Sequence, residues 1–456
     1  MTGFVKSRFV YQDMSKLEKF LFIMPFLYII IYLTDLALTE GRNVNYKLIF
    51  YILLFSVSSR FYLPVYRSSV FAFTAIPGLM AYRKEEKKEV NQQNFTKLHK
   101  KYAPKTLSVI KKLGGIFYKM GQIFGSRGDI SPLEYQETMA CLLDNVPSKP
   151  FPKIKSKLET ILPLLDSIEE TAMASASIGQ VHKGIYQGNQ IVIKVLYPNI
   201  ESQTKADLWV VKTWSKFAMK TLKDNVDSFS EITLNEFDFR NEASVYKLMK
   251  QSINIENVYF PKVYNELVSK DVLVLEYVNG ISLLNFIRSS NQEENRNMII
   301  RVFNVMFNQI YKLGIFSTDP HPGNFLITTN NILVPLDFGQ VGVLEEKEKE
   351  DFKDLMVSIS LKQNFDQVLS KIGFSSKNND SLFKSTYING MYNTKYDFLS
   401  TFTDFENMTA NDEWLTSPKN LGLVSKCITT LGGLCTLANI YDLSFADEFN
   451  KYLQTN

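Results

Sequence analysis

The chain has 456 residues, 45% of them hydrophobic and 21% charged, which is enough for two or three domains that each bury a core. Its 51 basic and 47 acidic residues are interspersed, and a net charge of +4 gives no electrostatic reason to expect a nucleic-acid partner. Three histidines, and three cysteines without a CxxC pair, argue against a zinc centre and a disulfide framework.

Three apolar runs stand near the N-terminus: FLFIMPFLYIIIYLT (20–34), LIFYILLFSVSS (48–59) and SSVFAFTAIPGLMAY (68–82). A membrane-spanning helix needs about 20 apolar residues, and the first two runs approach that length only by including Asp35 and Arg60. We expect residues 1–83 to associate with a membrane; the alternative is a set of buried or interfacial helices. Asp13 and Glu18 argue against a cleaved secretory signal and a transit peptide.

A polar break, RKEEKKEVNQQ (83–93), precedes a stretch with helical periodicity. Lys111, Gly115, Tyr118 and Gln122 recur at helical intervals, which predicts helices up to about residue 165.

Two strands are predicted next, in SASIGQVHKGIY and QIVIKVLYP, around a turn at Gln187–Asn189. In the second strand Lys194 alternates with aliphatic residues. A lysine buried there requires an acidic partner, and an acid-rich helix near 231–250 offers Glu242. The alternative is a lysine that reaches solvent from an edge strand. A further strand is predicted at 272–278, and the pattern beyond 281 is mostly helical.

Asp319 and Asn324 are five residues apart (324 − 319), in DPHPGN, and Asp337 follows in DFG. This is the spacing of a kinase catalytic loop and its metal-binding aspartate. Oxygen ligands of this kind suit Mg²⁺, so the set predicts a site for magnesium and ATP. The alternative is ordinary turn chemistry and a surface carboxylate. Strands followed by helices predict an α+β fold of two lobes with a cleft between them, and the kinase motifs above imply that this fold is protein-kinase-like.

Together these motifs resemble the UbiB/ADCK family of atypical kinase-like proteins. The resemblance covers roughly residues 100–345 and includes YKMGQ, ASAS, VIKV, EFDFRNEA, LEYVNG, DPHPGN and DFG. ASAS departs from the glycine-rich loop of ordinary protein kinases and resembles the alanine-rich loop of this family, with Ser175 where alanine is usual. Ser317 stands where the family usually has histidine.

The resemblance implies a role for each motif. The catalytic group would be Asp319, Lys194 and Glu242; the metal ligands Asn324 and Asp337; the nucleotide-binding residues Ala174, Ser175, Ala176, Ser177, Lys194, Glu276 and Val278; and the regulatory residues Lys119, Gln122, Glu236 and Asp238. The expected domains are 1–83 (membrane-associated), 84–168 (helical KxGQ extension), 169–280 (N-lobe) and 281–456 (C-lobe).

Lys119 and Gln122 share one helix face, and so do Asp238 and Glu242. Our hypothesis is that the KxGQ helix lies over the cleft, with Lys119 near Glu236 or Asp238, and blocks protein substrates. The alternative is that Lys119 and Gln122 belong to a solvated helix face.

The resemblance further implies an ATPase or atypical kinase that supports ubiquinone or other prenyl-lipid metabolism. Its partners would be an adenine nucleotide, a membrane lipid or prenyl-quinone intermediate, and a lipid-biosynthesis enzyme complex. It would act at an organelle membrane, either the mitochondrial inner membrane or a plastid membrane. Two alternatives stay open: a pseudokinase that senses nucleotide as a scaffold, and a protein kinase that acts in trans.

Overall fold

The computed structural model describes most of the chain from Gln92 onward. The described residues are 67, 70–71, 77–78, 80–82, 84–85, 92–126, 132–144, 148–218, 230, 233–376, 414–416 and 420–455. They fall into two compact units. One takes its residues from Met1–Gln122, Glu137–Met139 and Asn199–Ser230, and the other from Ile123–Gln136, Ala140–Pro198 and Glu231–Asn456.

The apolar runs at 20–34 and 48–59 lie outside the described residues, as does most of the run at 68–82. Within the part of the chain that the structure describes, no helix is both long and apolar enough to cross a membrane.

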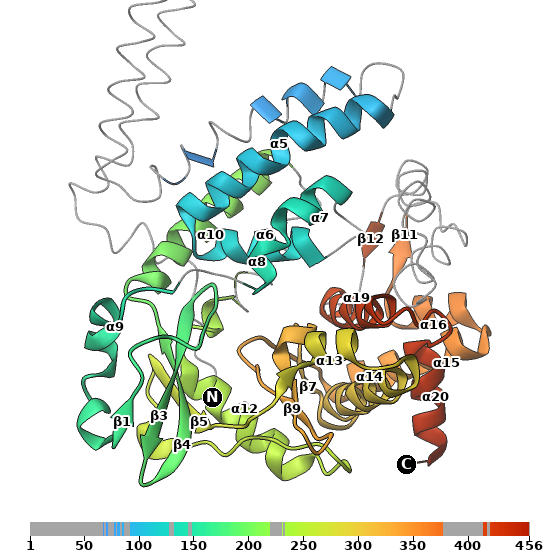
Figure 1. Cartoon of the computed structure of the whole chain (residues 1–456). Coiled ribbons are helices and arrows are strands. Elements are labelled where there is room, and N and C mark those ends of the chain that lie inside the picture. Colours follow the sequence, from blue (N-terminus) through green and yellow to red (C-terminus); the bar gives the residue numbers. More distant parts are fainter. Residues whose placement is uncertain are drawn as a thin grey trace, which may run out of the picture. The chain divides into compact units, whose positions relative to one another are not determined.

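The first unit is helical, with α5 (Gln92–Leu113), the start of α6 (Ile116–Ser126) and α10 (Ile200–Ala218) (Figure 1). The helical periodicity predicted through this region is interrupted, because Gly114 and Gly115 take positive φ angles of 62° and 56° and separate α5 from α6. Arg67 and Asp207 form a buried ion pair within this unit, with Nη2 2.7 Å from Oδ2.

The second unit contains an antiparallel sheet in the order β1-β3-β4-β5, and β2 also pairs with β3. Its strands are β1 (Ser167–Ile168), β2 (Ala174–Ser175), β3 (Gly179–Tyr186), β4 (Asn189–Leu196) and β5 (Val272–Glu276). The predicted turn joins β3 to β4, with φ angles of 50° at Gln187 and 73° at Gly188. Two positive φ angles in a two-residue turn match the twist of a hairpin.

β4 is a central strand, so its alternation decides which side chains enter the core. Ile191, Ile193 and Val195 are fully buried on one face, and Lys194 lies on the other. The helix α12 (Phe239–Ser252) packs beside β5. Its buried positions recur every three or four residues, which is the spacing of one helix face: Phe239, Glu242, Ala243, Tyr246 and Met249. Glu242 is therefore directed inward with the apolar residues.

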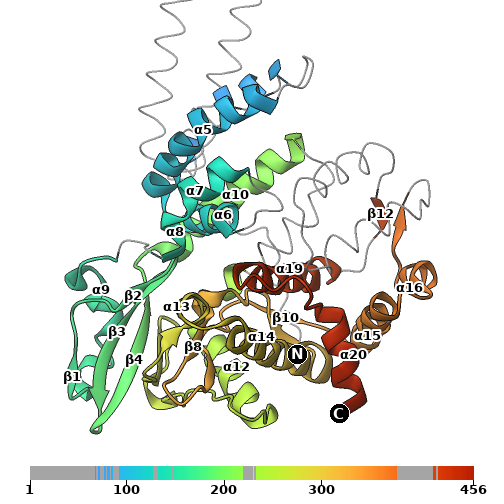
Figure 2. The same cartoon turned by 45° about the vertical axis from the view of Figure 1, so that its right-hand side comes forward.

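The helical part of the second unit is built on α14 (Gln292–Phe307), α15 (Glu346–Leu361) and α20 (Phe445–Thr455). Figure 2 shows α20 beside α14 and α15, and α20 is in contact with both. Phe445 anchors this packing, with its ring centroid 5.1 Å from that of Phe303 and 4.8 Å from that of Phe307. Helices and a small sheet together confirm a kinase-like fold with mixed helix and sheet content.

Short strand pairs hold the loops that contain Asp319, Asn324 and Asp337. The strands are β6 (Ile281–Ser282), β7 (Ile315–Ser317), β8 (Phe325–Ile327), β9 (Leu333–Pro335) and β10 (Val341–Val343). β7 pairs with β10, and β8 lies between β6 and β9. The loop from β7 to β8 contains Asp319 and Asn324, and the loop from β9 to β10 contains Asp337. The β7–β10 pairing brings the two loops together.

The remaining described elements are α7 (Leu133–Met139), α8 (Cys141–Asp144), α9 (Phe151–Leu158), α13 (Leu283–Ser289), α16 (Phe365–Lys371), α19 (Leu421–Leu437), β11 (Ser375–Ser376) and β12 (Trp414–Thr416), with the short turns η1 (Leu162–Leu164), η3 (Asn265–Leu267), η4 (Asn308–Leu313) and η5 (Pro322–Asn324).

Candidate active site

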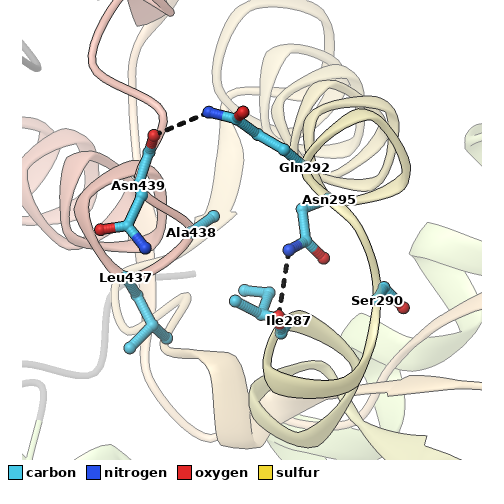
Figure 3. Close-up of a pocket in the computed structure, with 7 residues that line it drawn as sticks. All are labelled: Ile287, Ser290, Gln292, Asn295, Leu437, Ala438 and Asn439. Atoms are coloured by element: carbon cyan, nitrogen blue, oxygen red, sulfur yellow. Dashed lines mark hydrogen bonds between the residues drawn. The ribbon is translucent and has the colours of Figure 1, made fainter.

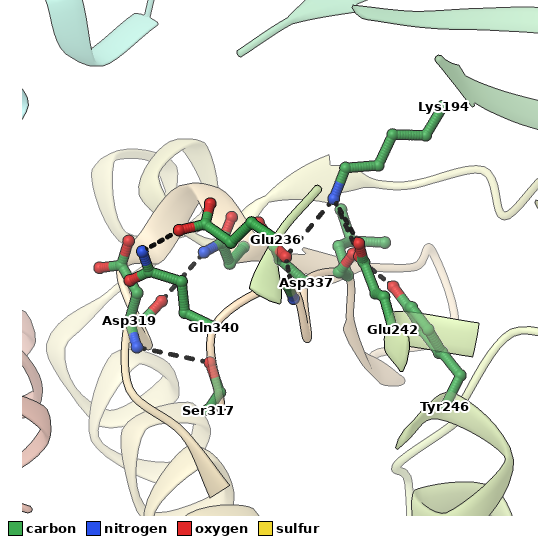
Figure 4. Close-up of polar contacts among 11 residues, drawn as sticks. Lys194, Glu236, Glu242, Tyr246, Ser317, Asp319, Asp337 and Gln340 are labelled. Carbon is green, nitrogen blue, oxygen red and sulfur yellow. Dashed lines mark hydrogen bonds and ion pairs between the residues drawn. The ribbon is translucent and has the colours of Figure 1, made fainter. Parts of the chain in front are cut away.

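A buried ion pair joins β4 to α12. Lys194 Nζ lies 2.9 Å from both carboxylate oxygens of Glu242 and 3.5 Å from Oδ1 of Asp337 (Figure 4). The side chain of Glu242 is 2% exposed, whereas that of Asp337 is 39% exposed. The lysine thus connects a carboxylate shielded from water to one that is open to solvent.

The three charges shift one another's titration. Burial alone would lower the pKa of Lys194, but Asp337 and Glu242 raise it well above its usual value. Burial raises the pKa of Glu242 to about 7; the cation of Lys194 opposes this rise and Asp337 adds to it. Shifted pKa values grouped around a solvent-open carboxylate are typical of functional sites.

Aromatic packing fixes the DFG segment against α12. Phe338 is 2% exposed and meets Tyr246 edge to face, with ring centroids 4.8 Å apart. The Tyr246 hydroxyl donates to the carbonyl oxygen of Leu336, and the main chain of Phe338 hydrogen bonds to Glu242. The position of Asp337 is therefore tied to the helix that carries Glu242.

The side chain of Asn324 forms a hydrogen bond across the predicted catalytic loop. Asn324 Nδ2 donates to the carbonyl oxygen of Asp319 at 2.9 Å, and the Leu336 N–H donates to the carbonyl oxygen of Asn324 at 2.8 Å. Because the amide nitrogen is used as a donor, the side-chain oxygen of Asn324 is the atom suited to a cation.

Ser317 stands where the resemblance leads us to expect histidine. Its Oγ accepts the Asp319 N–H at 3.5 Å, the outer limit of a hydrogen bond. Its own N–H donates to Oε1 of Gln309 at 2.9 Å, and the Thr318 N–H donates to the carbonyl oxygen of Gln340 at 3.0 Å. Neither glutamine could be predicted from the sequence, because a lone glutamine belongs to none of the kinase motifs.

The two acids of the ExD segment have different surroundings. Glu236 is 8% exposed and accepts a hydrogen bond from the side-chain amide of Gln340. Asp238 is the N-cap of α12 and accepts from the Arg240 N–H at 3.1 Å and from its Nε at 2.8 Å. The hydrogen bond from Arg240 lowers the pKa of Asp238. One acid thus faces the DFG segment, and the other caps a helix.

The alanine-rich loop is a tight hairpin at one end of the sheet. Ala174 and Ser175 form β2, and the Ala176 N–H donates to the carbonyl oxygen of Gly179 at 2.8 Å. Ser177 lies within the turn between β2 and β3.

The predicted nucleotide-binding residues Glu276 and Val278 lie at the end of β5 and just after it. Oε2 of Glu276 accepts from the Tyr259 hydroxyl at 2.5 Å and from the Lys262 N–H at 3.0 Å. These bonds fix the end of the strand, and Val278 follows two residues later.

The donor set fits Mg²⁺ better than a transition metal. Among the described residues no group of three or more His, Cys, Asp or Glu side chains could hold a metal ion. Mg²⁺ commonly binds one or two carboxylates and completes its coordination with substrate phosphates and water. The exposed carboxylate of Asp337 and the amide oxygen of Asn324 match that demand.

Cavity volume does not identify this site. A cavity of about 280 Å³ lies between α13, the start of α14 and the end of α19 (Figure 3). It has no charged lining residue: Ile287, Ser290, Gln292, Asn295, Leu437, Ala438 and Asn439 surround it. A cavity of about 190 Å³ includes Phe338 and Gly339 and lies beside α12. We therefore locate the candidate site by its charges.

Lys119 and Gln122 are half-buried residues of α6 in the first unit, whereas every other predicted site residue belongs to the second. Their relation to the cleft remains a prediction.

The chain resembles known proteins over the same region. Residues 142–371 match the family model of the ABC1 atypical kinase-like domain. "Protein ACTIVITY OF BC1 COMPLEX KINASE 7, chloroplastic" of Arabidopsis thaliana is 31% identical over 265 residues, which cover 55% of this chain and 38% of that protein. "Probable protein kinase UbiB" of Aeromonas salmonicida is 31% identical over 258 residues, which cover 52% of this chain and 47% of that protein. A solved structure, "The complex structure of Rv3197-erythromycin from Mycobacterium tuberculosis", is similar with a TM-score of 0.48 and 20% identity, covering 78% of this chain and 99% of the other.

Proposed function

Because this chain belongs to the ABC1 atypical kinase-like family, we propose that it binds ATP with Mg²⁺ in the cleft around Lys194 and hydrolyses it or transfers its γ-phosphoryl group. The observation that supports this most directly is the simultaneous contact of Lys194 with Glu242 and Asp337. In protein kinases the corresponding lysine–glutamate pair and the DFG aspartate must be in place together.

Each residue has a distinct part in the proposed reaction. Lys194, held by Glu242, orients the nucleotide phosphates, and Asp319 orients the attacking water or acceptor group. Asp337 and Asn324 hold magnesium, which when bound neutralises charge on the phosphates.

The nucleotide itself would be held by main-chain groups. The 174–177 hairpin covers the phosphates, and the main chain at Glu276 and Val278 meets the adenine. Support comes from the hairpin between β2 and β3 and from the fixed end of β5.

The proposed setting is a membrane that contains prenyl quinones. The resemblance to UbiB/ADCK proteins supports a prenyl lipid or quinone intermediate, and the apolar runs before residue 83 support membrane association. A chloroplastic relative supports a plastid membrane, and the mitochondrial inner membrane is the alternative. Other enzymes of lipid biosynthesis are the proposed protein partners.

The test is ATP turnover by the purified protein and its Asp337→Asn variant, with Mg-ATP binding measured in parallel. We expect the variant to lose turnover by about 10²–10³-fold, as when one transition-state contact is removed. Equal turnover in both proteins, with ATP bound, would favour a nucleotide-sensing scaffold. Strong labelling of lysate proteins from labelled ATP would favour a protein kinase that acts in trans.

A further inference from the structure

The chain makes a sharp reversal just before the catalytic loop. α14 continues into η4, a π-helical turn that ends at Gly314 with a φ of 68°. A Cβ atom at Gly314 would lie 2.9 Å from the carbonyl oxygen of Leu344, so only glycine fits. The reversal makes β7 run back against η4, with which it is in contact. Single π-helical turns are frequent next to functional sites.

Gln309 lies on this π-helical turn and is 1% exposed. Its Oε1 accepts the N–H of Ser317 at 2.9 Å. Among the strands that the structure describes, β7 has a neighbour, β10, on one edge only, so a buried N–H on the other edge needs an acceptor from elsewhere. The side chain of Gln309 supplies that acceptor.

We propose that Gln309 is a positioning residue for Asp319, and this inference rests on the proposed function above. The Ser317 hydroxyl is 3.5 Å from the Asp319 N–H, too far to fix the loop firmly. The two residues before Asp319 are instead held by their main chains, Ser317 by Gln309 at 2.9 Å and Thr318 by the carbonyl oxygen of Gln340 at 3.0 Å. In this chain, therefore, main-chain bonds do the work expected of the histidine that Ser317 replaces.

The test compares two changes at one position. Gln309→Met keeps the volume and removes the acceptor, whereas Gln309→Glu keeps an acceptor oxygen whether or not the carboxyl group is protonated. The control is Asn308→Leu, because Asn308 lies on the same turn but its Nδ2 donates back to the carbonyl oxygen of Asn304 in α14, at 2.9 Å, and not to residues 315–321. We measure kcat and the ATP dissociation constant, together with hydrogen exchange in a peptide that covers residues 315–321.

We expect Gln309→Met to lower kcat by about 10–100-fold, as for a catalytic group misplaced by about 1 Å, with the ATP dissociation constant unchanged. Exchange at residues 315–321 should rise, and Gln309→Glu should restore much of both. Asn308→Leu should match the wild type in kcat.

An unchanged kcat and unchanged exchange in Gln309→Met would overturn the inference. So would an equal loss of kcat in the Asn308→Leu control, which would indicate a general effect of the helical turn. If the wild-type protein bound no ATP, the proposed function would fall. The exchange of residues 315–321 would then still decide whether Gln309 holds the loop.

Discussion

At the scale of single residues, Lys194 is the cation that pairs with the buried carboxyl group of Glu242. Removing one partner of a buried ion pair costs about 3–5 kcal/mol. We therefore expect Lys194→Met to lower the free energy of unfolding by about that amount near neutral pH and to weaken ATP binding. Chemical denaturation and calorimetric titration measure the two effects.

In the same variant the free energy of unfolding should depend on pH more steeply than in the wild type, and the sign of this dependence is defined. Glu242 has a folded-state pKa of about 7, above its ordinary value of 4.5, so the folded state binds its proton more tightly than the unfolded state does. Its contribution to stability is complete below about pH 4.5 and is lost as the pH rises through 7. Without Lys194 the pKa rises further and the loss grows. The control Lys194→Met/Glu242→Gln should lack this extra slope, and a slope that persisted there would contradict the assignment.

Residues with a charge and a motif could be predicted from the sequence, and residues that only support them could not. Lys194, Glu242 and Asp337 were predicted from alternation and spacing, and the structure brings them together. Gln309, Gln340 and Tyr246 each form a side-chain hydrogen bond with a residue outside their own helix, strand or loop. Such bonds depend on where the chain reverses, and no local pattern records that.

At the scale of elements, two glycines should respond in opposite directions to alanine. A Cβ atom on Gly179 would clash with the carbonyl oxygen of Val195. Gly179→Ala should therefore push β3 away from β4 and lower the free energy of unfolding by about 1–3 kcal/mol or more. Gly432 lies inside α19, and no atom of the described residues lies within 4 Å of a Cβ atom at this position, so Gly432→Ala should add about 0.5–1 kcal/mol. Thermal unfolding measures both, and a destabilising Gly432→Ala would contradict the prediction.

The cap of α12 gives a second prediction at this scale. Asp238→Ala should lower the free energy of unfolding by about 0.5–2 kcal/mol, because it removes the N-cap of the helix that carries Glu242. Asp238→Asn keeps a capping oxygen and should lose much less. Urea denaturation of the two variants is the measurement. Equal losses would mean that the charge of Asp238, rather than its cap, stabilises the helix.

The sequence placed strands and helices well where the periodicity was uninterrupted. The β3–β4 hairpin and β5 lie where they were predicted. The helical periodicity from Lys111 to Gln122 did not reveal the break between α5 and α6. Gly115 fits the helical spacing, but the positive φ angles of Gly114 and Gly115 end one helix before the next begins. Spacing alone carries no information about φ.

At the scale of the whole molecule, the hypothesis that the KxGQ helix covers the cleft predicts communication between the two units. Lys119→Ala should change ATP affinity or autophosphorylation severalfold while the melting temperature stays close to that of the wild type. Lys112→Ala is the matched control, since Lys112 is exposed at the end of α5 in the same unit. If Lys119→Ala and Lys112→Ala gave the same ATP affinity and the same autophosphorylation, the alternative that Lys119 belongs to a solvated helix face would be favoured.

The central claim is that Lys194, Asn324 and Asp337 converge on a magnesium-bound nucleotide. Its most direct test is the melting temperature of the full chain with ATP and Mg²⁺, compared with ATP and a chelator. Ligand at 100 times its dissociation constant stabilises a protein by about 2.7 kcal/mol, so a clear rise that requires Mg²⁺ is predicted. An unchanged melting temperature with every adenine nucleotide, with or without Mg²⁺, would contradict the claim.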